Sequence, residues 1–115
     1  MTTSDLRNIH TLPELFQHRC NATPAAEAYR WFDAARQQWQ SFSWGDMQQR
    51  VAQWARAVQA SQLAADADGG ARIATLLTHS VHAVCIDQAG MSLGCATVPL
   101  HANDNPGNIS FILAD

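Results

Sequence analysis

Histidines and an aspartate in the last third of the chain are the first candidates for chemistry. His79 and His82 are three residues apart, and Asp87 follows five residues later. Imidazole nitrogens and carboxylates bind zinc, so this set could hold a metal ion. The same spacing is common in the first turn of an ordinary helix, and no third ligand is clearly placed. We therefore favour surface positions at the start of a helix.

Two further polar residues stand at the ends of apolar runs that read as strands. His101 follows the run CATVPL, and α/β sheets tend to bind ligands at the carboxyl ends of their strands. Arg72 opens the run RIATLL and could bind a phosphate. For both residues the favoured interpretation is a plain surface position, an exposed loop for His101 and a solvent-facing cap for Arg72.

The cysteines and tryptophans also allow a chemical and a structural interpretation. Cys20, Cys85 and Cys95 show no C-x-x-C spacing, which argues against a disulfide framework and fits a reducing compartment. Cys85 and Cys95 lie in apolar runs, where the pKa of a thiol rises, so neither is expected to be a nucleophile. The four tryptophans could form a platform for a sugar or an acyl chain, but their spacing favours cross-strand pairs and core anchors. They are Trp31, Trp39, Trp44 and Trp54.

Composition narrows the functional classes. The chain has 115 residues, a net charge of −3, and seven basic residues that are all arginine. The absence of lysine excludes a Schiff-base lysine and a P-loop lysine within these residues, and the isolated pair Gly69–Gly70 lacks the P-loop pattern. The acidic balance disfavours nucleic acid and anionic membranes as partners. No apolar run approaches a membrane span and no export signal opens the chain, so we expect a cytoplasmic protein.

The first half of the chain predicts a helix, a hairpin and a second helix. Residues 11–20 have Thr11 and Glu14 at capping-box spacing, and they place Leu12, Leu15, Phe16 and Cys20 on one stripe. Residues 27–33 and 38–43 are rich in aromatic residues and predict a β-hairpin around a loop at 34–37. Ser43 and Asp46 then mark a helix start. Its apolar stripe is Met47, Val51, Trp54, Ala55 and Val58, and the helix breaks within 61–70.

The last third has a strand–helix–strand rhythm. Residues 72–77 and 95–100 are apolar runs, and between them residues 80–93 predict a helix capped by Ser80 and ended by Gly94. Such a unit implies parallel strands. Its helix is apolar on most sides, so it should be buried between layers. Residues 109–113 begin another apolar helical pattern.

The predicted fold class is therefore α/β. An N-terminal helix and a β-hairpin precede the first βαβ unit of a larger parallel sheet, with no internal domain boundary in residues 1–115. Parallel strands are stable when both neighbours and both faces are covered, and this chain supplies only two such strands. We expect that it is the opening part of something larger, or that it dimerises.

Three segments carry a family pattern: TLPELFQHRCNATPAAEAYRWF, WQSFSWGDMQQRVAQWARAV and HSVHAVCIDQAGMSLGCATVPLHANDNPGNISFILAD. Together they resemble the N-terminal end of the AMP-forming acyl-CoA synthetases, such as long-chain fatty acid CoA ligases, in the adenylate-forming ligase superfamily. The resemblance covers almost the whole chain. It rests on scaffold motifs, because none of the three segments is a catalytic signature.

The resemblance implies a parent enzyme that joins a fatty or related carboxylic acid to AMP and then transfers the acyl group to CoA. It implies ATP, Mg²⁺ and CoA as cofactors of that enzyme, and none is expected to bind this chain alone. No catalytic, cofactor-binding or metal-binding residue is assigned to residues 1–115. The expected partners are the remainder of the catalytic domain or a second copy of the chain.

The sequence departs from the family pattern at caps and turns. The usual Gly-Asp-Arg before the first parallel strand is Gly70, Ala71 and Arg72 here, and the frequent Pro-Glu-Trp at the helix start is Val81, His82 and Ala83. Gln62 stands where glycine is common. These changes indicate a diverged member. The alternative to a ligase segment is a free-standing, non-catalytic module that binds an apolar ligand or a partner through the aromatic hairpin.

Overall fold

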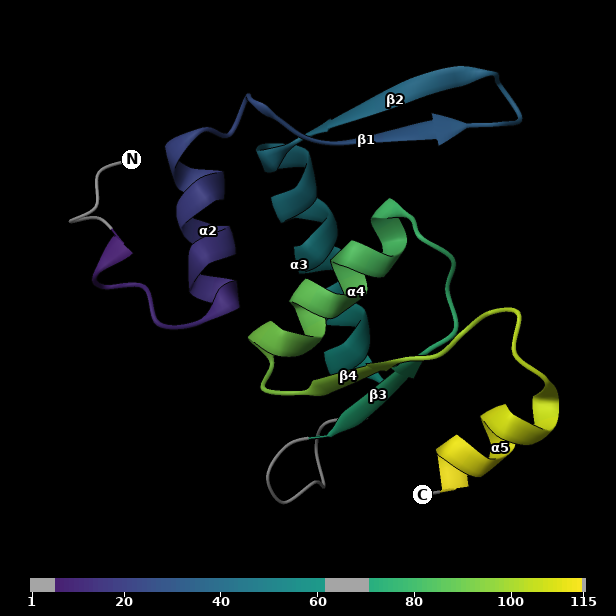
Figure 1. Cartoon of the computed structure of the whole chain (residues 1–115). Coiled ribbons are helices and arrows are strands. Elements are labelled where there is room, and N and C mark those ends of the chain that lie inside the picture. The colour runs from purple at the N-terminus through teal and green to yellow at the C-terminus, as the bar shows by residue number, and fades with distance from the viewer. Residues whose placement is uncertain (1–5, 62–70, 115) are drawn as a thin grey trace.

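The computed structural model describes residues 6–61 and 71–114 (Figure 1). Its elements are helix α2 (Leu12–Ala22), strands β1 (Glu27–Asp33) and β2 (Gln38–Ser43), helix α3 (Trp44–Ala60), strand β3 (Arg72–Thr75), helix α4 (Val81–Ser92), strand β4 (Ala96–Pro99) and helix α5 (Pro106–Ala114). Strands β1 and β2 pair antiparallel, and β3 and β4 pair parallel. The predicted α/β fold, a hairpin followed by a parallel βαβ unit, is confirmed. That this unit opens a larger sheet stays a prediction.

Helix α2 begins and ends as its sequence predicts. The Glu14 N–H donates to Thr11 Oγ1 at 3.2 Å, while the Glu14 carboxylate accepts from the His10 N–H at 2.7 Å. The helix stops at Ala22, because Pro24 disfavours helical geometry in the residue before it.

The predicted apolar stripe of α2 is buried only in part. Cys20 is buried and Phe16 is half-buried, but Leu12 and Leu15 are 60% and 40% exposed. Both leucines line an open hollow of about 270 Å³ between α2, β1 and α4. The predicted amphipathic helix is confirmed, and the start of its stripe stays exposed because no described element closes over its first turn.

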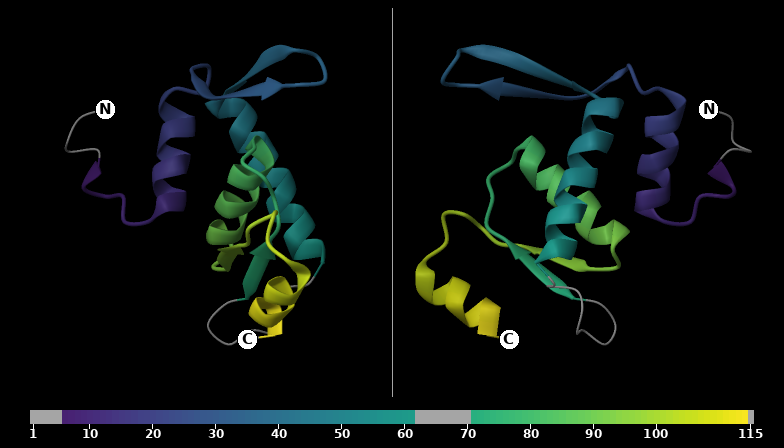
Figure 2. Two further views of the ribbon diagram at one scale, coloured as in Figure 1. Left: turned by 45° about the vertical axis from the view of Figure 1, so that its right-hand side comes forward. Right: turned by 180° about the vertical axis from the view of Figure 1, so that it is seen from behind.

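The hairpin has the predicted strands and loop. Asp33 Oδ1 accepts from the N–H groups of Ala35 and Arg36 at 3.1 and 3.3 Å, which fixes the turn. Gln37 adopts the left-handed region with φ 52°, and its side chain donates to the Ala34 carbonyl at 2.8 Å. The hairpin extends away from the helices, so its far end is open to solvent (Figures 1 and 2).

Helix α3 begins with a complete capping box. The Asp46 N–H donates to Ser43 Oγ at 3.0 Å, and the Ser43 N–H donates to the Asp46 carboxylate at 2.9 Å. The Ser43 backbone bond holds the pKa of the Asp46 carboxyl below its ordinary value. The predicted stripe faces the core, with three of its residues buried and Trp54 and Ala55 half-buried. The buried residues are Met47, Val51 and Val58.

Replacing Ser43 with alanine is expected to lower the free energy of unfolding by about 1 kcal/mol, because the Asp46 N–H loses its acceptor. Urea denaturation followed by circular dichroism measures the change. Ser110→Ala is the matched control, since Ser110 is exposed within α5, and its effect should stay below about 0.5 kcal/mol. Equal losses in the two variants would contradict a stabilising cap.

The βαβ unit forms around a capped helix. The Ala83 N–H donates to Ser80 Oγ at 3.3 Å, and the chain leaves the helix through Gly94, whose φ of 76° is accessible to glycine without strain. The strands are shorter than predicted. Strand β3 ends at Thr75, and the next residues, Leu76 and Leu77, are 50% and 42% exposed, because the parallel ladder does not reach them.

Helices α3 and α4 form the core with the base of the hairpin. Helix α4 lies across α3, and the two views of Figure 2 show the pair in contact. The predicted burial of α4 is confirmed on the face toward α3 and the β3–β4 sheet. The buried cluster contains Phe42, Met47, Val51, Val81, Cys85 and Ala89.

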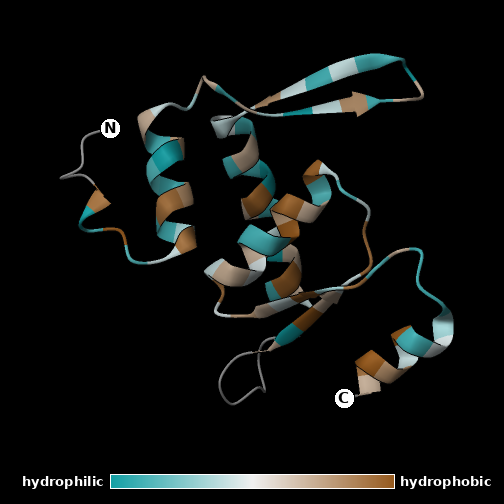
Figure 3. Cartoon of the chain, in the orientation of Figure 1, coloured by the Kyte–Doolittle hydropathy of each residue, from teal (hydrophilic) through white to brown (hydrophobic). Residues whose placement is uncertain are grey.

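Helix α5 forms as predicted but packs on nothing described. None of its residues is buried, and Phe111 and Leu113 are 76% and 60% exposed. Figure 3 shows the hydrophobic residues of α5 in brown near the C-terminus. The radius of gyration is 16.1 Å, above the roughly 13 Å of a compact chain of this length, because the hairpin and α5 project. Among the described helices, none is long and apolar enough to cross a membrane.

Candidate functional site

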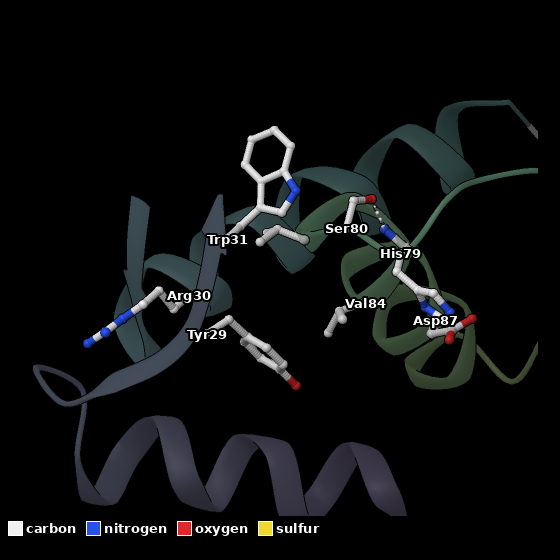
Figure 4. Close-up of a pocket in the computed structure, with 9 residues that line it drawn as sticks. Tyr29, Arg30, Trp31, His79, Ser80, Val84 and Asp87 are labelled. Carbon is white, nitrogen blue, oxygen red and sulfur yellow. Dashed lines mark hydrogen bonds between the residues drawn. The ribbon is translucent and has the colours of Figure 1, made fainter. Parts of the chain in front are cut away.

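Two adjoining hollows lie on either side of the first half of α4. The first has a volume of about 410 Å³ and lies between α4 and the underside of the hairpin (Figure 4). The second has a volume of about 600 Å³ and lies where strands β3 and β4 end. Three residues belong to both linings: His79, Ala83 and Asp87.

The wall shared by the two hollows carries a carboxylate. Asp87 is half-buried, and within the described residues it makes no hydrogen bond or ion pair. His79 is exposed and lines both hollows together with Asp87 (Figure 4). Taking a carboxylate partly out of water without a partner is unfavourable, so this position favours a cation or a hydrogen-bond donor.

The opposite wall of the first hollow comes from β1. Figure 4 shows the Tyr29 ring and the Asp87 side chain on opposite sides of Val84. Burial raises the pKa of the Tyr29 phenol, so its hydroxyl stays neutral and available as a hydrogen-bond donor. Arg30 lies at the rim, where its guanidinium is paired with the Glu27 carboxylate at 3.0 Å.

The second hollow lies at the carboxyl ends of the parallel strands. The Leu100 N–H donates to the Thr75 carbonyl at 2.8 Å, just beyond the end of the β3–β4 ladder. His101 follows and is exposed, as the favoured interpretation has it, yet it also lines this hollow. His79, Asp87 and His101 all line this hollow, and ligand contact by His101, the less favoured interpretation, stays a prediction.

The structure separates the two histidines that were considered as a metal pair. His82 lies against Trp54, with ring centroids 6.4 Å apart, and does not line either hollow. In the described ranges 6–61 and 71–114, no group of three or more histidine, cysteine or acidic residues could hold a metal ion. His79 precedes the N-cap Ser80, whereas His82 lies in the first turn of α4, so the two side chains have different surroundings, which three-residue spacing alone does not reveal.

The buried cysteines act as core residues. Cys85 and Cys95 are 1% and 6% exposed, and burial raises the pKa of the Cys85 thiol, as predicted for a small hydrophobe. Cys20 is also buried, with its Sγ 3.4 Å from the Trp44 carbonyl oxygen. Burial raises the pKa of the Cys20 thiol as well.

The tryptophans divide between packing and exposure. Trp44 packs edge-on against Phe16 and Tyr29, with centroid separations of 6.1 and 6.0 Å. Trp39 forms the predicted cross-strand pair with Phe32, with centroids 5.2 Å apart, but it remains 66% exposed.

The remaining candidates lie away from the hollows. Arg72 is exposed at the start of β3, the end of the strand opposite the second hollow, which agrees with a solvent-facing position. The pair Gly69–Gly70 and the turn residue Gln62 lie outside the described residues.

The sequence interpretation did not place the hairpin and Asp87 at one site. It allowed Trp31 a ligand platform but favoured packing, assigned Tyr29 no site role, and considered Asp87 only for a metal set. Alternation along β1 was the available signal, because it places residues 29 and 31 on one face of the strand. It did not reveal that this face lies opposite α4.

Comparison with known proteins identifies the family. The family described as AMP-binding enzyme matches residues 16–115 of this chain. The chain belongs to the AMP-binding enzyme family. The resemblance to the N-terminal end of the adenylate-forming ligases is thus confirmed, whereas no curated protein sequence matches significantly.

Solved structures agree with this family assignment at the level of the fold. A fatty acyl-CoA synthetase from Mycobacterium tuberculosis is 23% identical with a TM-score of 0.73, and the match covers 88% of this chain and 18% of that protein. The N-terminal subdomain of Klebsiella oxytoca NpsA is 18% identical with a TM-score of 0.73, over 90% and 24% of the chains. The N-terminal domain of Mycobacterium tuberculosis FACL13 is 22% identical with a TM-score of 0.74, over 91% and 25%. The chain thus spans a quarter or less of the length of these three proteins.

Proposed function

We propose that this chain is the N-terminal scaffold of an AMP-forming ligase that activates a fatty or related carboxylic acid. The observation that carries the proposal is the family match over residues 16–115. Structural likeness to a fatty acyl-CoA synthetase supports the choice of a fatty acid as substrate. The odd number of cysteines, all three of them free, supports a cytoplasmic location.

The proposed reaction has two balanced steps. The carboxylate attacks the α-phosphorus of ATP, which forms acyl-AMP and releases pyrophosphate. The CoA thiol then attacks the acyl carbon, loses its proton and displaces AMP, which gives acyl-CoA. Both steps need groups that stabilise negative charge on phosphate oxygens.

The residues of this chain do not fit ATP, Mg²⁺ or CoA. The chain has no lysine, and its net charge is −3. Arg30, at the rim of the first hollow, is held by Glu27, and the half-buried Asp87 would repel a phosphate. We therefore propose that the rest of the parent enzyme binds all three cofactors. The role of this chain is to position the βαβ unit.

The proposal predicts an all-or-none difference in pyrophosphate exchange. The 115-residue chain should show no acid-dependent exchange of labelled pyrophosphate into ATP, because it lacks a lysine and a phosphate-binding loop. The longest natural polypeptide that contains this chain should show exchange that depends on an added fatty acid. Exchange by the 115-residue chain would refute the scaffold role, and its absence from the longer polypeptide would refute the ligase.

A second candidate function is a non-catalytic module that binds a partner through the hairpin. The exposed pair of Phe32 and Trp39, 38% and 66% exposed, favours it. Reading the coding sequence beyond Asp115 discriminates between the two functions. A downstream loop rich in threonine, serine and glycine, followed by lysine, supports the ligase, whereas a stop codon and a stable dimer in light scattering support the module.

A further inference from the structure

The first hollow combines an apolar lining with one unpaired charge. Tyr29, Trp31, Val81 and Val84 supply the apolar surface, and Asp87 supplies the carboxylate. Its volume of about 410 Å³ lies within the roughly 300–1,000 Å³ that is usual for small-molecule sites. Sites of this kind are mostly apolar, with a few polar groups that fix orientation.

The negative charge of Asp87 determines whether this site favours a cationic or an anionic ligand. Asp87 has no hydrogen bond or ion pair within the described residues, and the nearest guanidinium in the lining, that of Arg30, is paired with Glu27. An anion would meet the Asp87 carboxylate without a free cation beside it. A metal ion would lack the further ligands that it needs, since the described residues contain no group of three. An organic cation satisfies both the carboxylate and the apolar wall.

We infer that the first hollow binds a small organic ammonium ion, with its ammonium group at the Asp87 carboxylate and its apolar body against Tyr29, Trp31 and Val84. The elements place these groups suitably. Figure 4 shows Val84 between Tyr29 on β1 and Asp87 on α4, so a ligand over Val84 reaches both walls. An N⁺–H···O⁻ hydrogen bond is about twice as strong as its neutral counterpart, which gives the site its preference for charge.

The opening of the site admits such a ligand from solvent. Trp31 is 37% exposed and His79 is exposed, so the rim of the hollow is accessible. His79 also lines this hollow, and an imidazole nitrogen can accept a hydrogen bond from a second ammonium proton. This binding activity does not involve ATP or a carboxylic acid, so it is independent of the proposed ligase reaction.

A titration with two ligands of the same shape tests the inference. The ¹H–¹⁵N spectrum of the 115-residue chain is recorded with increasing 2-phenylethylamine, which is an ammonium ion at pH 7, and with neutral 2-phenylethanol. We expect saturable shifts in the amides of residues 29–31 and 79–87, and binding about tenfold weaker for the alcohol. Equal affinities, or shifts centred elsewhere, would overturn the inference.

Two variants test whether the Asp87 carboxylate is the group that binds the ammonium ion. Asp87→Asn preserves the shape of the side chain and should weaken 2-phenylethylamine binding about tenfold, while its effect on 2-phenylethanol should stay within twofold. Glu14→Gln removes a charge on α2, outside the lining, and should leave both affinities within twofold. Equal weakening by the two variants would indicate a general charge effect and would contradict the site.

The longer natural polypeptide provides a second measurement. Calorimetric titration with 2-phenylethylamine and 2-phenylethanol should give the same order of affinities there. If that polypeptide does not bind the amine in preference to the alcohol, the hollow is filled in the complete protein and the inference fails. Pyrophosphate exchange, measured separately, reports on the ligase whatever the outcome of the titration.

Discussion

Replacing Met47 with alanine is expected to lower the free energy of unfolding by about 2–5 kcal/mol. Met47 is 0% exposed at the centre of the cluster that joins the hairpin base, α3 and α4. Truncation removes buried methylene and thioether contacts and leaves a cavity that surrounding helices fill only in part. Urea denaturation of the 115-residue chain, followed by circular dichroism, measures the loss.

A volume-conserving substitution separates the cavity from other effects. Met47→Leu keeps the position apolar and of similar size, so its cost should stay below about 1.5 kcal/mol. A loss below about 1 kcal/mol for Met47→Ala would contradict the placement of this residue at the centre of the core. Equal losses for leucine and alanine would show that cavity size does not determine the effect.

Replacing Gly90 with alanine is expected to lower the free energy of unfolding by up to about 2 kcal/mol. A Cβ at this position would lie 2.9 Å from Thr97 Cγ2, where helix α4 crosses strand β4. Overpacking costs about 1–3 kcal/mol, and the better helix propensity of alanine offsets about 1 kcal/mol of that cost. Urea denaturation again measures the change.

The partner residue supplies the control for Gly90. Thr97→Ser removes the methyl group that the new Cβ would meet. In that background Gly90→Ala should stabilise the chain by up to about 1 kcal/mol, because the propensity gain remains and the collision is gone. A loss of the same size in both backgrounds would show that Thr97 is not the cause.

The features that sequence predicted correctly depend on residues close together in the chain. The capping box joins Ser43 and Asp46 across three positions, and the loop at 34–37 is closed by Asp33. Apolar periodicity placed Met47 and Val51 on the buried face of α3. Ser80 and Gly94 bound helix α4 for equally local reasons, a hydroxyl acceptor and a left-handed backbone.

The features that sequence did not reveal depend on what lies opposite in space. Leu12 and Leu15 share the stripe of Cys20, yet they remain exposed, since no described element covers the first turn of α2. Leu76 and Leu77 continue an apolar run beyond the end of the parallel ladder.

The candidate site likewise depends partly on residues close together in sequence and partly on residues close together only in space. The sequence by itself determined the hairpin, the helix caps, the parallel βαβ unit and the absence of lysine, because these depend on local hydrogen bonding, periodicity and composition. Only the tertiary structure decided that Asp87 faces Tyr29 across a hollow while His82 turns to Trp54. The crossing of α4 over α3 and the position of the hairpin set these contacts, and residues more than twenty positions apart in the chain create both.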